Sequence, residues 1–194
     1  MIPEIHIEDY NYPLSDERIA KYPLPERDSS KLLRYTKGSV DEFVFKQLPD
    51  LLPSDAIMVF NDTKVVPARM HFQRETGAII EIFCLKPINP VEYNTVFATT
   101  ETCTWRCVIG NSKRWKDDLL HLYNPEANED IAKMNLRAGL VRKDGETGIV
   151  EFRWDNGAPF SNVLETCGMV PIPPYLNRDT EAIDLERYQT LYAK

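Results

Sequence analysis

Residues 59–70 read VFNDTKVVPARM, and the interpretation of the whole chain depends on this stretch. Its start belongs to a short apolar run, which predicts a buried strand over Ile57–Phe60. The polar cluster Asn61–Thr63 follows where that strand would end, a common position for a ligand site in sheets packed with helices. The alternative is an Asn-Asp turn whose side chains bond their own backbone. Pro67 cannot donate to a sheet, so the chain bends or starts a new strand there.

The composition is that of a globular chain with a core. Hydrophobic residues make up 43% of the 194 residues and charged residues 27%. The 23 basic and 30 acidic residues give a net charge of -7, which argues against a generic phosphate-binding protein. No apolar stretch is long enough to span a bilayer, and no signal peptide is recognisable at the N-terminus. We therefore expect a cytoplasmic protein without a membrane partner.

The cysteines and histidines do not predict a metal site. Cys103 and Cys107 have a C-x3-C spacing, but no second pair and no nearby histidine completes it. Buried, reduced thiols are the expected state of all four cysteines. We expect no bound metal and no cofactor.

The middle of the chain has the pattern of an all-β domain. Short runs of β-branched and aromatic residues recur at intervals of about ten residues, the spacing typical of a barrel or sandwich. The expected strands are Val65–Gln73, Ala78–Leu85, Tyr93–Thr99, Thr104–Ile109, Leu119–Tyr123, Leu136–Arg142 and Thr147–Trp154. No long amphipathic helix fits here, so residues 65–155 are predicted to form a separate small β-barrel.

The flanking segments, residues 1–64 and 156–194, mix strand and helix patterns. Two strands are expected within residues 32–45, and short helices after Ser15 and around residues 47–52. After the barrel, the apolar residues of 160–167 have helical spacing, with Gly168 placed as the residue that ends the helix. A last helix is expected from Asp184. The predicted fold is thus an α/β (α+β) domain, residues 1–64 plus 156–194, interrupted by an inserted small β-barrel.

Five strings in this order resemble one enzyme family. They are IAKYPLPERDSSKLL (19–33), VFNDTKVVPARM (59–70), TGAIIEIFCL (76–85), VPIPPYLNR (170–178) and DLERYQTLYAK (184–194). Together they resemble the S-adenosylmethionine:tRNA ribosyltransferase-isomerases of queuosine biosynthesis. The likeness is looser over residues 92–139, and Met169 stands where the family usually has a histidine or an acid. In the family a further α/β half follows the last string, so this chain resembles an N-terminal portion.

The resemblance implies a reaction on tRNA. The family transfers the ribosyl part of S-adenosylmethionine to 7-aminomethyl-7-deazaguanine in tRNA and isomerises it, giving epoxyqueuosine. S-adenosylmethionine is then a co-substrate, and tRNA is the second partner. Because catalysis needs groups that converge on the transition state, we expect this chain alone to be inactive or nearly so.

The chemistry implied by the resemblance suggests roles for several residues. Asp62 is the candidate catalytic base or ribose acceptor, with Asn61 and Thr63 as orienting groups. Arg69 is suited to a phosphate or carboxylate. The other candidate substrate-binding residues are Arg27, Tyr175, Arg178, Tyr188 and Gln189.

Each of these assignments has an ordinary structural alternative. Arg27 with Asp28 can form a surface ion pair, and Tyr175 can be a core aromatic rather than a platform for a base. The basic loop at residues 113–116 can meet tRNA or simply be solvated. For the whole chain, the alternatives to the transferase are a non-catalytic tRNA-binding module and a structural fragment.

Overall fold

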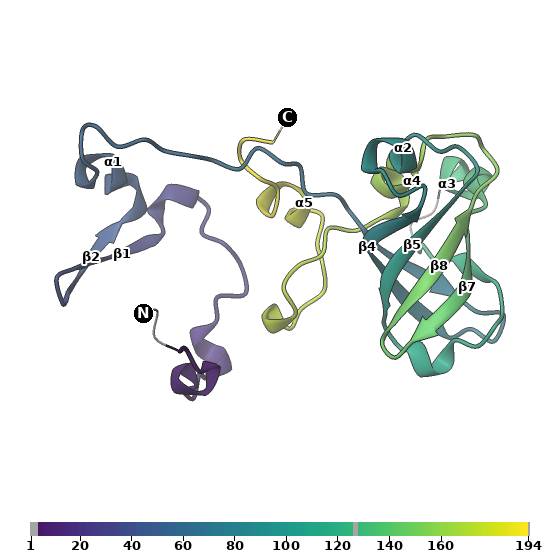
Figure 1. Cartoon of the computed structure of the whole chain (residues 1–194), viewed down its shortest axis with the longest axis horizontal. Helices are drawn as coiled ribbons and strands as arrows, with labels where there is room; N and C mark the ends of the chain where they lie inside the picture. The colour runs from purple at the N-terminus through teal and green to yellow at the C-terminus, as the bar shows by residue number, and fades with distance from the viewer. Residues whose placement is uncertain (1–3, 126–127, 194) are drawn as a thin grey trace. The chain divides into compact units, whose positions relative to one another are not determined.

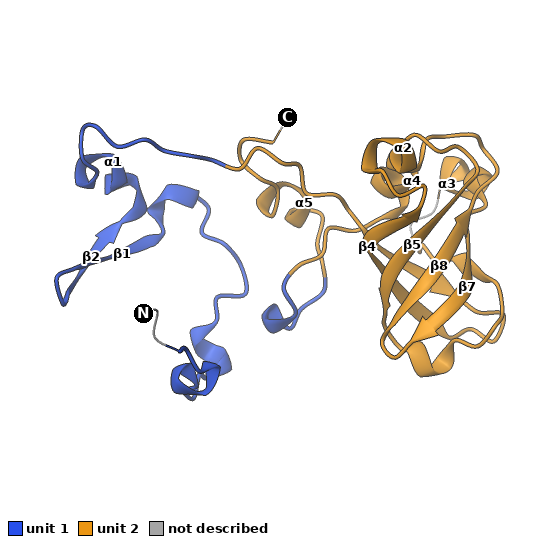
Figure 2. Cartoon of the chain, in the orientation of Figure 1, with its two compact units in different colours: residues 1–60, 173–179 blue, residues 61–172, 180–194 orange. Residues whose placement is uncertain are grey.

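The computed structural model describes residues 4–125 and 128–193 and divides into two compact units (Figures 1 and 2). Unit 1 comprises Met1–Phe60 and Pro173–Asp179, and unit 2 comprises Asn61–Ile172 and Thr180–Lys194. The predicted fold class is confirmed: the chain contains a small closed β-barrel and, separately, a part with a two-stranded sheet and short helices. The domain bounds 1–64 with 156–194 and 65–155 stay a prediction.

Unit 2 is built around a closed, antiparallel six-stranded barrel with strand order β3-β4-β5-β8-β7-β6. Its strands are β3 (Arg69–Gln73), β4 (Ile79–Asn89), β5 (Thr102–Ile109), β6 (Leu120–Leu122), β7 (Arg137–Asp144) and β8 (Thr147–Arg153). Buried and less buried residues alternate along these strands; in β5 the buried ones are Cys103, Trp105, Cys107 and Ile109. This period of two places one face of each strand in the barrel core.

Short helices cover the barrel (Figure 1). They are α2 (Tyr93–Phe97), η5 (Ser112–Arg114), α3 (Glu129–Met134) and α4 (Phe160–Cys167), and α5 (Asp184–Arg187) follows near the C-terminus. The predicted helix over residues 160–167 is confirmed, and its buried residues Phe160, Val163, Leu164 and Cys167 share one helical face. The Phe160 ring packs against Trp105, Phe152 and Trp154, with centroids 5.3–5.8 Å apart, which joins α4 to the barrel core.

One predicted strand of the barrel is wrong. Within the predicted strand Tyr93–Thr99, Tyr93–Phe97 form helix α2, although Tyr93, Val96 and Phe97 favour a sheet. As a helix, the segment places Tyr93 and Phe97 four residues apart on one face, with centroids 6.1 and 5.9 Å from the Trp105 ring. Covering the barrel core with aromatic surface outweighs the local preference for a strand.

Unit 1 has little regular structure. It contains a two-stranded sheet of β1 (Lys31–Thr36) and β2 (Ser39–Val44), helix α1 (Leu48–Leu51), and the single-turn helices η1 (Ile7–Tyr10), η2 (Asp16–Arg18), η3 (Arg27–Ser29), η4 (Phe45–Gln47) and η6 (Pro174–Leu176). The two predicted strands and the helical turn near residue 50 are confirmed. The helix expected after Ser15 is only the turn η2, and the last helix α5 ends at Arg187.

The buried strand predicted at Ile57–Phe60 is wrong for this structure. The segment has no regular secondary structure, and Ile57 and Val59 are 92% and 91% exposed. A buried strand needs neighbouring strands and a layer over each apolar face. The only sheet among the described residues of unit 1 is the β1–β2 pair, which does not include this segment.

The described residues contain no helix with the length and apolar character needed to cross a membrane.

Candidate functional site

The polar cluster after Phe60 forms a local turn. Asn61 Oδ1 accepts hydrogen bonds from the backbone N–H of Thr63 at 3.0 Å and from its hydroxyl at 2.7 Å. This is the self-bonded turn considered as the alternative. Asp62 lies between the two residues, exposed, and its carboxylate makes no hydrogen bond or ion pair with any residue that the structure describes. The turn thus presents one carboxylate to solvent.

The chain after this turn is held by Gln189, which lies 124 residues later. The Val65 N–H donates to Gln189 Oε1 at 2.7 Å, and Gln189 Nε2 donates to the Val65 carbonyl at 3.2 Å. Beside it, Lys64 Nζ lies 2.8 Å from Glu165 Oε1. The side-chain amide therefore satisfies both backbone groups of Val65, as a neighbouring strand would.

The same segment packs closely against the end of α4. Arg69 and Met169 exchange two backbone hydrogen bonds, of 3.3 and 2.7 Å. A Cβ on Gly168 would lie 1.8 Å from the Pro67 carbonyl oxygen, so no side chain fits there. Gly168 follows the last residue of α4, as predicted, and its φ is -91° rather than positive. Glycine is required by close approach of two backbones rather than by φ.

Arg69, on β3, faces an acid on the neighbouring strand β4. Its Nε lies 3.7 Å from Glu81 Oε1, and His71 Nε2 lies 3.5 Å from Glu81 Oε2. The hydrogen bond from His71, helped by the charge of Arg69, lowers the pKa of Glu81 although partial burial opposes this. Glu81 was not among the predicted site residues. Its signal was a single charge inside the apolar string of residues 76–85.

Three predicted site residues belong to unit 1. Arg27 lies in η3, and Tyr175 in η6 is 63% exposed, which excludes the core role considered for it within this structure. Arg178 donates from Nε to the Lys21 carbonyl at 2.9 Å and lies over the Tyr22 ring, 4.5 Å from its centroid. Arg178 thereby ties the string of residues 170–178 to the string of residues 19–33.

The structure brings together some of the predicted residues of unit 2. Asn61 contacts Thr63, and Gln189 holds the segment between Thr63 and Arg69. Tyr188 directly precedes Gln189 and is half-buried. Three of the five family-like strings, residues 59–70, 76–85 and 184–194, therefore contact one another in unit 2. The first of them also packs against Gly168 at the end of α4.

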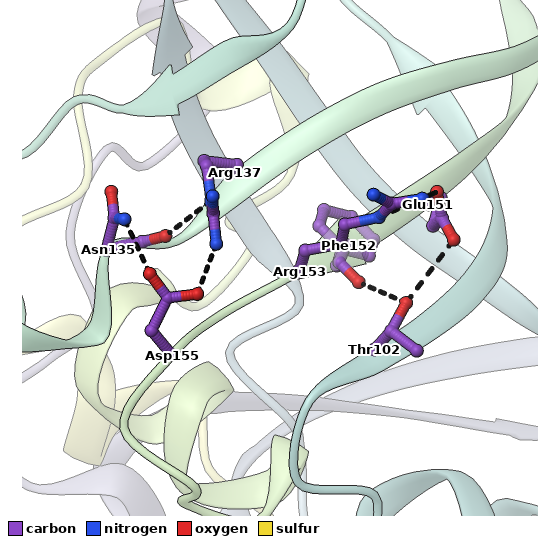
Figure 3. A network of polar contacts seen from close by, with 7 residues as sticks. All are labelled: Thr102, Asn135, Arg137, Glu151, Phe152, Arg153 and Asp155. Carbon is purple, nitrogen blue, oxygen red and sulfur yellow. Dashed lines mark hydrogen bonds and ion pairs between the residues drawn. The ribbon is translucent and has the colours of Figure 1, made fainter.

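A second polar region lies on the barrel (Figure 3). Several of its side chains line a cavity of about 460 Å3. Asp155 accepts from Asn135 Nδ2 at 2.6 Å and from Arg137, while Glu151 accepts from Arg153 at 2.8 Å (Figure 3). Both arginines are thus neutralised by carboxylates of the same region. The cavity is not suited to an anion, and none of the predicted site residues lines it.

The side chains that could bind a metal ion do not lie close together among the described residues. The four cysteines are buried as free thiols. Among residues 4–125 and 128–193, no three histidine, cysteine, aspartate or glutamate side chains are close enough to hold one metal ion. In the basic loop at residues 113–116, Trp115 is 2% exposed and donates to the Asp118 carbonyl, so its ring is not available to stack on RNA.

Comparison with known proteins identifies the family. The family model described as "Queuosine biosynthesis protein" matches residues 7–194. Similar curated proteins named S-adenosylmethionine:tRNA ribosyltransferase-isomerase come from Trichlorobacter lovleyi (34% identical over 96% of this chain and 49% of the relative), Psychrobacter arcticus (34%; 97% and 48%) and Geobacter sulfurreducens (33%; 97% and 50%). The chain spans about half the length of the curated relatives it matches. Its identity to them and the match over nearly all its residues mean that the chain belongs to the queuosine biosynthesis protein family.

Proposed function

We propose that this chain supplies part of an S-adenosylmethionine:tRNA ribosyltransferase-isomerase. The reaction transfers the ribosyl moiety of S-adenosylmethionine to 7-aminomethyl-7-deazaguanine in tRNA and isomerises it to epoxyqueuosine, releasing adenine and methionine. S-adenosylmethionine is consumed as a co-substrate, and no metal or cofactor takes part. The observation that carries the proposal is the similarity to relatives of that name over 96–97% of the chain.

The first chemical requirement is a base for the proton next to the sulfonium. Asp62 meets the requirement for accessibility, because its carboxylate is exposed and unpaired within the described structure. The hydrogen bonds between Asn61 and Thr63 fix the backbone on both sides of it. A base held in this way loses less freedom when substrate binds.

The second requirement is the binding of charged substrate groups. Arg69 is partly exposed and is held by Glu81 at 3.7 Å, a distance that leaves room for a phosphate or carboxylate to compete for the guanidinium. Arg27 and Tyr175 are exposed and remain proposed contacts for tRNA or for the adenine base, together with Arg178 and Tyr188.

The side-chain amide of Gln189 already makes hydrogen bonds within the chain through both its oxygen and its nitrogen. Its amide holds the Val65 backbone, and its Oε1 also accepts from the Thr190 N–H at 3.0 Å. We therefore assign it to positioning the chain that leads from Asp62 to Arg69.

The test is a turnover assay with S-adenosylmethionine and tRNA that bears 7-aminomethyl-7-deazaguanine, following adenine and methionine release. The chain alone should be nearly inactive. Adding the part of the Trichlorobacter lovleyi relative that this chain does not match should produce turnover. Asp62→Asn should abolish that turnover, whereas Asp55→Asn, a matched change of an exposed aspartate six residues before the Asn61 turn, should leave it unchanged. Equal turnover in both variants would remove Asp62 from the mechanism.

A non-catalytic tRNA-binding module is the second candidate. The names of the similar proteins do not favour it, but a closed barrel can fold without the turnover that the first proposal requires. Such a module would bind tRNA with an affinity that falls steeply with salt, with or without S-adenosylmethionine. A salt series of binding measurements, run beside the turnover assay, separates the two functions.

A further inference from the structure

The barrel carries three basic residues in one line across its outer face. Strands β4, β5, β8 and β7 are neighbours in that order (Figure 1). Lys86 on β4 lies directly opposite Arg106 on β5, which lies opposite Ile149 on β8, and Ile149 lies opposite Arg142 on β7. Directly opposite residues share a face, and Arg106 points outward because its two neighbours on β5 are buried. Lys86, Arg106 and Arg142 are called the basic row below.

Two β-bulges produce this alignment. The register of β4 against β5 shifts at Leu85, and the register of β7 against β8 shifts at Val141. Each is one extra residue in its strand, and the two are 42% and 62% exposed. Without the extra residue, strict alternation would turn Lys86 and Arg142 toward the barrel core. The bulges therefore direct both cations to the outer face.

The basic row is poorly neutralised by the chain itself. Its one ion pair with a described residue joins Arg106 to Asp144 at 4.0 Å, and the Asp144 side chain is 69% exposed. Glu151 on β8 is held by Arg153 at 2.8 Å. Like charges directly opposite each other on neighbouring strands destabilise a sheet, so placing Lys86 against Arg106 lowers the stability of the barrel. An anionic ligand on the row would remove this repulsion.

The basic row lies next to Arg69 of the candidate site. Arg69 pairs with Phe83 on β4, and Phe83 pairs with Val108, which is two residues from Arg106 on β5. Two residues along a strand span about 7 Å. Arg69 also points to the outer face, because its neighbour on β3 is buried. An extended ligand that follows the row therefore passes close to Arg69.

We propose that the basic row binds the phosphate backbone of the RNA substrate. Neighbouring strands are about 4.8 Å apart, so Lys86 and Arg106 lie close enough to share one phosphate. Arg142 lies two strands beyond Arg106, about 10 Å away, a spacing that fits an extended polyanion better than a single phosphate ion. A nucleic-acid strand carries one negative charge per roughly 3.4 Å of its axis.

The choice of RNA as the polyanion rests on the proposed function. Phosphate contacts position a nucleic acid without reading its sequence, so the row serves any part of the RNA that lies across the barrel. Its role is to hold the RNA while the reacting base lies elsewhere. The net charge of -7 does not oppose this, because the contact depends on local charge.

The test is binding of the 194-residue chain to an unmodified tRNA transcript, without S-adenosylmethionine. Fluorescence anisotropy is measured in a salt series from about 50 to 200 mM. Lys86→Gln, Arg106→Gln and Arg142→Gln should each weaken binding about five- to eightfold near 0.1 M salt. Each should also reduce the slope of log affinity against log salt by about 0.7–0.9, the value for one phosphate contact.

Two comparisons separate a local contact from a general effect of charge or folding. Lys133→Gln, at a residue of α3 that is 67% exposed, removes the same charge away from the row and should leave affinity and slope unchanged. Thermal unfolding without RNA should show that Lys86→Gln is at least as stable as the unchanged chain, because repulsion of Arg106 is relieved. A lower Tm would contradict the repulsion on which the proposal depends.

Four binding results would overturn the proposal. The first is no salt-dependent binding of tRNA by the unchanged chain, and the second is normal binding by all three row variants. The third is an equal loss with Lys133→Gln, or a loss with Lys113→Gln alone, which would place the contact in the loop at residues 113–116. The fourth is loss of binding to phosphatidylserine vesicles with unchanged tRNA binding, because the partner would then be an anionic membrane.

Failure of the row and failure of the proposed function give different results. Binding needs neither turnover nor the modified base, so loss of binding in the row variants supports the row even where the turnover assay shows no reaction. Turnover that is unaffected by all three substitutions, with unchanged tRNA affinity, would remove the row and leave the reaction in place.

Discussion

Replacing Gly168 with alanine tests the packing that joins the candidate site to helix α4. The added Cβ would lie 1.8 Å from the Pro67 carbonyl oxygen and 2.5 Å from that of Leu164. Since contacts below 3.0 Å essentially do not occur, the Pro67 carbonyl must retreat by roughly 1.2 Å. The φ of -91° is suitable for alanine, so the cost is steric and not conformational.

The expected loss of unfolding free energy can be estimated from the contacts that a shift of Pro67 would disrupt. Retreat of Pro67 pulls apart the paired hydrogen bonds between Arg69 and Met169, each worth about 1 kcal/mol. Overpacking against backbone adds roughly 1–3 kcal/mol. A loss of about 3 kcal/mol lowers the Tm of a domain of this size by about 12 °C.

The assay is thermal unfolding followed by circular dichroism, with Gly139→Ala as the matched control. A Cβ at Gly139 would meet only Leu119 Cδ1, at 3.8 Å, an ordinary contact. That variant should unfold within about 2 °C of the unchanged chain. If Gly168→Ala also stays within that range, close packing against Pro67 is not what the glycine provides, and the reasoning is refuted.

Three further predictions concern single side chains. The pKa of Glu81 in the folded chain lies below the ordinary 4.5, so the ionised carboxylate stabilises the fold above that pH. This stabilisation is lost as the pH falls through the lowered pKa. The difference in unfolding free energy between the unchanged chain and Glu81→Gln, measured by urea unfolding, should therefore shrink from pH 6 to pH 3. All four thiols are buried, and burial raises the pKa of Cys167 to about 11. A disulfide reagent at pH 8 should therefore react with the four thiols only after denaturation, and rapid reaction of the folded chain would contradict this. Gln189→Ala removes both partners of the Val65 backbone, so exchange of the Val65 amide should speed up roughly tenfold while barrel amides keep their rates.

The barrel could be predicted from the sequence because apolar and polar residues alternate along its strands as they do in the structure. In β5 and β8 every second residue is buried, and the sequence shows that alternation directly. Helix α4 was predictable for the same reason, with a period of 3.6 instead of two. In both cases the partners that bury the apolar face lie within the chain.

The errors have a different origin. The apolar pattern of Ile57–Phe60 is that of a buried strand, but burial also needs neighbours, and the described chain supplies none at Ile57–Val59. In helix α2, aromatic contacts with Trp105 outweigh a preference for strand that is weak outside its context.

The sequence suggested residues for a candidate site, and their roles stay a prediction, but it could not show the contacts between them. The string of residues 59–70 identified Asn61, Asp62 and Thr63, and chemistry suggested their roles. The pairing of Gln189 with Val65 joins residues 124 positions apart, and no local pattern encodes it. Glu81 could be found only once the register of β3 and β4 set it beside Arg69 and His71.

The paired hydrogen bonds between Arg69 and Met169 have an evolutionary consequence. They join the residue that opens the barrel to a residue one hundred positions later, so the chain leaves the barrel where it entered. A module whose two ends are neighbours can be gained, lost, enlarged or exchanged without altering the spacing of the polypeptide around it. The barrel's loops are therefore free to diverge among relatives at a different pace from the strings that flank it, and the barrel is the natural place to graft a new binding specificity.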